Sequence, residues 1–207
     1  MTTKDLFRWK VSREAAYEML IAAYTKAVES RGMACDIPEA VLSYLATIAE
    51  VMTTHSTKCG ILLCGNCGNG KTTTMEAFAN VSRFLDETYR RQCMEKGKWP
   101  EVVKIEKTSA RRISQIAKDE NAMSEAKKVH VLCIDDVGLE PTEVLDYGNA
   151  INPVIEIMEV RYRLQLFTFV TTNLTPPQIR EKYGDRIADR FNEMMKCIVY
   201  KNPTFRK

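Results

Sequence analysis

The chain has 207 residues, of which 45% are hydrophobic and 28% charged, and its formal net charge is +3. This length fits one domain with a short appendage, and the hydrophobic content is sufficient for a sizeable core. The near-neutral balance excludes the overall basic field that by itself predicts nucleic-acid binding, although it is compatible with a local basic groove.

The sequence carries no marks of secretion or membrane insertion. Charges occur throughout the first ten residues, and no run approaches the ~20 apolar residues of a membrane span. The seven cysteines are odd in number and irregularly spaced, unlike a disulfide framework. Cys64 and Cys67 have CxxC spacing, but no second pair or histidine completes a zinc site. We expect a soluble, reduced, cytoplasmic protein with no membrane partner.

Two helices are predicted before residue 58. Apolar residues recur at spacings of three and four from Glu14 to Glu29, and again in a helix that starts near Asp36 with Pro38 in its first turn. The apolar stripe of the first helix either packs on its own domain or docks a partner helix, and the pattern leaves both open. The members of this stripe are Ala15, Met19, Leu20, Ala23 and Ala27. We assign residues 1–55 to a short helical N-terminal segment and linker, a candidate for partner docking, and residues 56–207 to the core domain.

Strands and helices alternate from Cys59 onward. Strands are predicted at 61–64, 102–105, 129–134, 166–171 and 197–200. Helices are predicted at 71–91, at 110–118, from Pro153, from a capping box at Thr175–Gln178 to Gly184, and after Asp185 as a candidate cap. The alternation predicts an α/β fold with a parallel five-stranded sheet between helices.

A glycine-rich loop follows the first predicted strand. It matches the pattern GxxxxGK[ST], and its residues are Gly65, Asn66, Cys67, Gly68, Asn69, Gly70, Lys71 and Thr72. Glycines let backbone amides approach phosphate oxygens, and the helix that follows directs its positive end at the same place. Lys71 would neutralise phosphate charge, Thr72 would bind Mg²⁺, and Thr73 completes the predicted phosphate site. The pattern predicts ATP and Mg²⁺ as cofactors.

Two carboxylates end the third predicted strand. Val131–Ile134 is apolar and leads directly into Asp135 and Asp136, which is the Walker B pattern. Asp135 is a candidate Mg²⁺ ligand, and Asp136 is placed to activate the attacking water. Asn173 comes just after the fourth predicted strand, at the sheet edge where ligands bind in such folds. Arg186 and Arg190 lie one helical turn apart, either as solvated charges or as an arginine finger.

This ordered series resembles the AAA+ ATPases, and within them the DnaC/IstB-like helicase-loader group. The resemblance spans Cys59 to Arg206 and rests on Gly65–Thr72, Ile134–Gly138, Arg161–Tyr162, Thr171–Leu174, Tyr183–Arg186 with Arg190, and Thr204–Arg206. It implies that Asn173 is the sensor 1 residue, Arg190 the arginine finger and Arg206 the sensor 2 arginine.

The sequence also departs from the wider family. Pro203–Thr204 replaces the usual glycine-serine context of the sensor 2 arginine, and Asp136 stands where many AAA+ proteins carry glutamate, which implies slow turnover. The resemblance further implies that the helical lid usual after the last strand is absent, as it largely is in DnaC-like proteins.

The leading hypothesis is an ATP-hydrolysing AAA+ protein that loads a replicative DNA helicase during DNA replication. The partners it implies are that helicase, single-stranded DNA, and further copies of the chain or a related ATPase. An IstB-like ATPase that serves a transposase has the same core. A P-loop small-molecule kinase would need a mobile lid, which we do not find. A nucleotide-binding module without turnover is the remaining alternative.

Overall fold

A computed structural model describes residues 6–142, 144–146 and 149–205. Its main sheet has five parallel strands in the order β2-β3-β6-β1-β7. The strands are β1 (Gly60–Gly65), β2 (Ile105–Ser109), β3 (Val131–Val137), β6 (Phe167–Thr172) and β7 (Met195–Tyr200). The predicted α/β fold with a parallel five-stranded sheet is confirmed.

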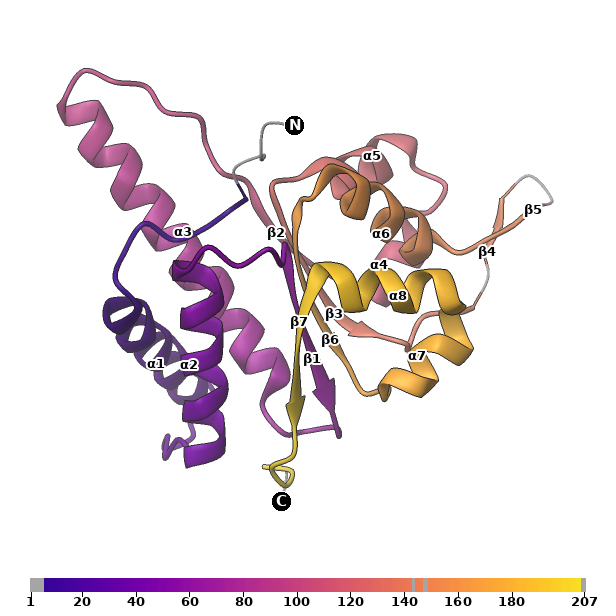
Figure 1. Cartoon of the computed structure of the whole chain (residues 1–207), viewed down its shortest axis with the longest axis horizontal. Coiled ribbons are helices and arrows are strands. Elements are labelled where there is room, and N and C mark those ends of the chain that lie inside the picture. The colour runs from indigo at the N-terminus through magenta and orange to yellow at the C-terminus, as the bar shows by residue number, and fades with distance from the viewer. Residues whose placement is uncertain (1–5, 143, 147–148, 206–207) are drawn as a thin grey trace.

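Helices cover both faces of this sheet (Figure 1). One face carries α1 (Arg13–Glu29), α2 (Glu39–Thr53) and α3 (Lys71–Glu95). The other face carries α4 (Ala110–Gln115), α5 (Glu120–Lys128), α6 (Pro153–Leu164), α7 (Pro176–Tyr183) and α8 (Asp185–Met194). The three central strands, β1, β3 and β6, are mostly buried, which explains why they read as continuous apolar runs in the sequence. Among the described residues, no helix combines the length and apolar character that crossing a bilayer requires.

The two N-terminal helices, α1 and α2, share a hydrophobic core with the sheet. In α1, Ala16, Leu20 and Tyr24 are buried in the same cluster as Phe78 of α3 and Phe169 of β6. Trp9 joins this cluster and donates its indole N–H to Ser82 Oγ at 3.1 Å. Of the predicted stripe on α1, Leu20 is fully buried, and Met19 and Ala23 pack against the cluster. The structure therefore favours packing within the domain for this stripe.

Three details differ from the sequence predictions. The second strand begins at Ile105, where pairing with Val131 starts, and not at Val102, which is exposed. Gly184 occupies the N-cap of α8, so Asp185 is the first helical residue and pairs with Arg180. The helix α5 and a two-stranded hairpin, β4 (Val144–Asp146) with β5 (Asn149–Ile151), were not predicted.

Candidate functional site

The glycine-rich loop joins β1 to α3 at the carboxyl edge of the sheet. Strand β1 lies between β6 and β7, so the loop emerges beside the ends of both neighbours. Gly70 has φ 96° and caps α3, and a Cβ there would lie 2.7 Å from the Tyr24 hydroxyl. Only glycine fits this combination of backbone conformation and close approach.

Lys71 is the centre of the polar contacts in this loop. Its residue is 5% exposed, and its ammonium donates hydrogen bonds to oxygens of the loop and of the neighbouring strand end. The acceptors are the Gly65 carbonyl (2.8 Å), the Asn66 carbonyl (2.7 Å), Asn69 Oδ1 (3.1 Å) and Asn173 Oδ1 (2.9 Å). The structure thus brings together the predicted phosphate-binding lysine and the predicted sensor asparagine.

Thr72 and Asp135 form the pair predicted to bind magnesium. Thr72 Oγ1 donates to Asp135 Oδ1 at 3.1 Å, and Thr171 Oγ1 donates to the same oxygen at 2.5 Å. Mg²⁺ in nucleotide sites is held by one or two protein oxygens, phosphates and water. The hydroxyl and carboxylate oxygens fit this donor set, so Thr72 and Asp135 are the residues that would hold the ion.

Asp136 follows directly and has φ 55°, a left-handed conformation uncommon for a residue other than glycine. Its backbone N–H donates to Thr171 Oγ1 at 3.0 Å, and the residue lines the same cavity as Lys71. Burial lowers the pKa of Lys71, while the nearby charges of Asp136 and Asp135 oppose that shift.

A cavity of about 1080 Å³ opens over this cluster. One part of its lining comes from the phosphate loop, Asp136 and Asn173. The other part comes from the end of α1 and the segment before α2, and includes Tyr24, Val28, Arg31, Met33, Cys35 and Pro38. The cavity therefore has a polar half beside the glycine-rich loop and a more apolar half beside α1, a combination that is common in ligand sites.

Arg31 also lines this cavity, and no motif in the sequence singles it out. Its Nη1 donates to Thr73 Oγ1 at 3.0 Å, and its Nη2 lies 2.5 Å from Glu76 Oε2. Burial would raise the pKa of Glu76, but ion pairs with Lys107 and Arg31 outweigh it and hold that pKa below its usual range. Arg31 and Thr73 are 42 positions apart, so no local spacing could have linked them.

The sequence matches no family model and no curated protein. Solved structures share its fold. A DnaC helicase loader superposes with a TM-score of 0.57 at 18% identity, over 86% of this chain and 98% of that one. DnaI gives 0.56 at 20% identity, over 94% and 99%. The AMPPCP-bound DnaA from Aquifex aeolicus gives 0.54 at 18% identity, over 80% of this chain and 48% of that one.

The chain has the AAA+ P-loop fold. At these identities the likeness concerns the fold alone. The chain spans about half the length of the DnaA chain and nearly all of the DnaC and DnaI chains. In this fold, the glycine-rich loop, Asp135 and Asn173 lie at the carboxyl edge of the parallel sheet.

The predicted arginine finger of this AAA+ fold is engaged within its own chain. Arg190 Nη1 lies 2.8 Å from Glu159 Oε1, its guanidinium lies 5.0 Å from the Tyr162 ring centroid, and 18% of its side chain is exposed. Arg186 reaches the same carboxylate at 3.3 Å, with 72% of its side chain exposed. The role of Arg190 stays a prediction, and acting on another subunit would require it to leave Glu159.

The C-terminal tail returns to the phosphate loop after β7. Phe205 N–H donates to the Gly68 carbonyl at 2.8 Å, and Asn202 Nδ2 donates to the Asn69 carbonyl at 3.0 Å. Phe205 also lines the cavity. Arg206, the predicted sensor 2 arginine, lies outside the described residues, and its role stays a prediction.

The CxxC cysteines do not pair with each other. Cys64 is buried at the end of β1, and its Sγ lies 3.8 Å from Cys197 Sγ on β7. Cys67 is exposed in the phosphate loop. Among the described residues, no group of three or more His, Cys, Asp or Glu side chains could hold a metal ion. Cys64 is thus a strand residue and Cys67 a loop residue.

Proposed function

We propose that this chain binds ATP with Mg²⁺ at the phosphate loop and hydrolyses it. The observation that carries the proposal is the convergence of Lys71, Thr72, Asp135 and Asn173 at one sheet edge, through contacts of 2.9 and 3.1 Å. A terminal phosphate bound there meets a cation, a pair of magnesium-binding oxygens and an amide at once.

Each residue has a distinct task in this reaction. Lys71 and the N-terminal end of α3 bind phosphate oxygens, because both carry positive charge. Thr72 and Asp135 would hold Mg²⁺, which would supply positive charge against the charge that develops on the phosphates. Asp136 accepts the proton of the attacking water, and Asn173 orients that water. The contact of Lys71 with Asn173 fixes the amide close to the phosphate-binding cation.

We infer that the ATPase serves a replicative DNA helicase. Support comes from the similarity of fold to DnaC, a helicase loader, which this chain covers almost completely. The likeness to an AMPPCP-bound DnaA supports the nucleotide. In this proposal, single-stranded DNA and further copies of the chain are the other partners, and ATP controls assembly with them.

Capture of the helicase tests this role. Asp136→Asn protein should retain ATP and so hold the assembled state. Incubated with Mg²⁺, ATP and the purified replicative helicase encoded alongside it, this variant should form a complex that survives gel filtration. Lys71→Ala protein, which cannot hold ATP, is the matched control and should form little complex.

The opposite result has a clear meaning. If neither the parent nor Asp136→Asn protein retains the helicase with ATP, with ADP or without nucleotide, the loader role is wrong. The IstB-like alternative then leads, and retention of a transposase encoded beside the chain is the corresponding measurement.

A further inference from the structure

The segment that carries Asp136 continues into Gly138, Leu139 and Glu140. Gly138 has φ 110°, and a Cβ there would lie 2.7 Å from Leu174 Cδ1. Asp136 itself has φ 55°. Non-glycine residues persist in this conformation only where the surrounding structure holds them. The contacts that hold this segment therefore determine where the Asp136 carboxylate lies.

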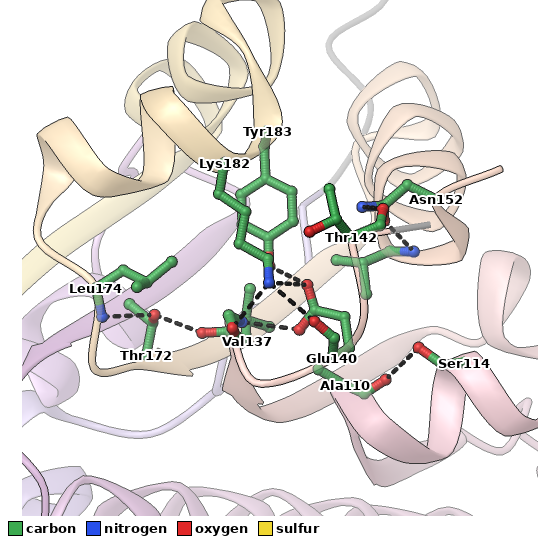
Figure 2. Close-up of polar contacts among 12 residues, drawn as sticks. Ala110, Ser114, Val137, Glu140, Thr142, Asn152, Thr172, Leu174, Lys182 and Tyr183 are labelled. Atoms are coloured by element: carbon green, nitrogen blue, oxygen red, sulfur yellow. Dashed lines mark hydrogen bonds and ion pairs between the residues drawn. The ribbon is translucent and has the colours of Figure 1, made fainter. Parts of the chain in front are cut away.

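Glu140 is buried beneath this segment. The residue is 3% exposed, and its Oε2 accepts a hydrogen bond from the Gly138 N–H at 2.8 Å. Its Oε1 accepts from the Tyr183 hydroxyl, which reaches down from α7 (Figure 2). Burial, and to a smaller extent the hydrogen bond to Glu140, raise the pKa of Tyr183. The phenol therefore stays protonated and remains a donor.

Lys182, the neighbour of Tyr183 on α7, supplies the matching charge. Its ammonium donates to the Gly138 carbonyl at 2.9 Å and to the Glu140 carbonyl at 2.8 Å, and it lies 3.8 Å from Glu140 Oε1. Figure 2 shows Lys182 and Tyr183 pointing from α7 onto the same short segment. A buried carboxylate is costly unless it is paired and hydrogen-bonded, and here both conditions are met.

A second anchor comes from β6, which ends at Thr172, directly before Asn173. Thr172 Oγ1 donates to the Val137 carbonyl at 2.5 Å and accepts from the Leu174 N–H at 3.0 Å. The segment after Asp136 is thus tied on one side to β6 and on the other to α7. Only the second tie depends on ionised side chains.

We propose that Glu140, held by Tyr183 and Lys182, is a positioning residue that fixes the Asp136 segment for hydrolysis. The proposal rests on the proposed ATPase function. Glu140 bonds to the Gly138 N–H, two residues from Asp136, and is absent from the residues that line the nucleotide cavity. It acts through the backbone that carries Asp136. Loss of this contact should therefore slow the chemical step and leave nucleotide affinity unchanged.

Three variants separate positioning from general stability. Glu140→Ala removes both acceptors. Glu140→Gln keeps an acceptor for the Gly138 N–H and a partner for the Tyr183 hydroxyl. Tyr183→Phe removes only the hydroxyl and preserves the ring. Tyr89→Phe, which loses a hydroxyl on the exposed end of α3, is the matched control.

Steady-state ATP hydrolysis is measured together with ATP affinity and with hydrogen exchange of the Gly138 amide. In Glu140→Ala protein, kcat should fall about 10- to 100-fold, as supporting contacts around reactive groups typically give, with KM unchanged. The Gly138 amide should exchange faster. Glu140→Gln should restore most of the turnover and amide protection, Tyr183→Phe should give a smaller loss, and Tyr89→Phe should match the parent.

Two results would overturn the positioning role. One is Glu140→Ala protein with parental kcat. The other is a Gly138 amide that exchanges at the parental rate in Glu140→Ala protein. This second measurement tests the Glu140 contact independently of ATP hydrolysis. A parent that binds ATP and hydrolyses none contradicts the proposed hydrolysis itself, and is distinguished from either result by the parent's own rate.

Discussion

Asp136 combines an uncommon backbone conformation with the position expected of a water-activating carboxylate. Its φ is 55°, and its backbone N–H is bonded to Thr171 Oγ1 at 3.0 Å. Thr171 also donates to Asp135, so one hydroxyl sets the relation of the two acids. These contacts agree with the proposed roles, in which Asp135 contacts magnesium and Asp136 is the general base.

The Asp136→Asn variant tests this division. Asparagine has the same shape and also tolerates the left-handed conformation, but it cannot accept the proton of water. ATP affinity should stay near the parental value while turnover falls about 10²- to 10⁴-fold. Radiolabelled phosphate release and equilibrium binding measure the two effects. Asp119→Asn is a suitable control, because asparagine caps α5 as well as aspartate does. Parental turnover in Asp136→Asn protein contradicts the base role.

Cys197 is the residue with a testable dependence on pH. Its hydrogen bond from Cys64 lowers the pKa of the Cys197 thiol to about 7, against the opposing effect of burial. Because the thiolate is the reactive form, iodoacetamide modification of Cys197 should rise through pH ~7, below the ~8.5 of a free thiol. In Cys64→Ala protein the rise should move to higher pH. Peptide mass spectrometry after short exposure measures both profiles, and identical profiles would show that Cys64 has no such effect.

At the scale of elements, α6 and α8 hold the predicted arginine finger. Glu159 of α6 pairs with Arg190 and Arg186 of α8, and Arg190 is the less exposed of the two. An arginine supplied by another subunit can contribute about 10³–10⁵ in rate. To act in this way, Arg190 must leave Glu159 when subunits assemble.

Mixing two inactive variants tests this trans arrangement. Arg190→Ala protein should bind ATP normally and lose hydrolysis, whereas Lys71→Ala protein should lose binding. Mixed, they should recover part of the activity, because Lys71→Ala subunits supply Arg190 to intact phosphate loops. Arg186→Ala is the control for loss of an arginine on the same helix. Absence of recovery, together with a parental specific activity that does not change with protein concentration, would indicate a monomer acting in cis.

The placement of the residues at the strand ends could be predicted from the sequence because each motif is local. The phosphate loop, Asp135, Asp136 and Asn173 each follow a buried apolar run, and parallel strands bring their carboxyl ends to one edge. Arg31 and Glu140 were not predictable in this way. Arg31 meets Thr73 across 42 positions and Glu140 meets Tyr183 across 43, so only the folded chain juxtaposes them. Helix α5 was missed because its one large buried apolar side chain is Met123.

At the scale of the whole molecule, the two N-terminal helices, α1 and α2, share one hydrophobic core with the sheet. Leu20 and Ala16 of α1 are fully buried with residues of α3 and β6, and Tyr24 and Arg31 line the cavity over the glycine-rich loop. The partner docking predicted for these helices from the sequence must therefore use their outer surfaces. A substitution on their buried face should therefore lower the free energy of unfolding of the whole domain.

Leu20→Ala tests this continuity. Removal of a fully buried leucine typically lowers the free energy of unfolding by about 2–5 kcal/mol, because a cavity remains. Met94→Ala, at the exposed end of α3, should change it by less than about 0.5 kcal/mol. Urea unfolding followed by circular dichroism measures both. A single transition shifted by Leu20→Ala indicates one core, whereas an early separate transition for α1 would contradict it.

The central claim is that the loop from Gly65 to Thr72 binds ATP with Mg²⁺, and titration calorimetry of ATP in the presence of Mg²⁺ tests it most directly. The parent should bind one ATP per chain. Lys71→Ala protein should bind at least about 30-fold more weakly, because it removes the buried cation that faces the phosphates. Lys118→Ala protein, which loses an exposed lysine, should bind as the parent does. Equal ATP affinity in the parent and in Lys71→Ala protein would contradict the account.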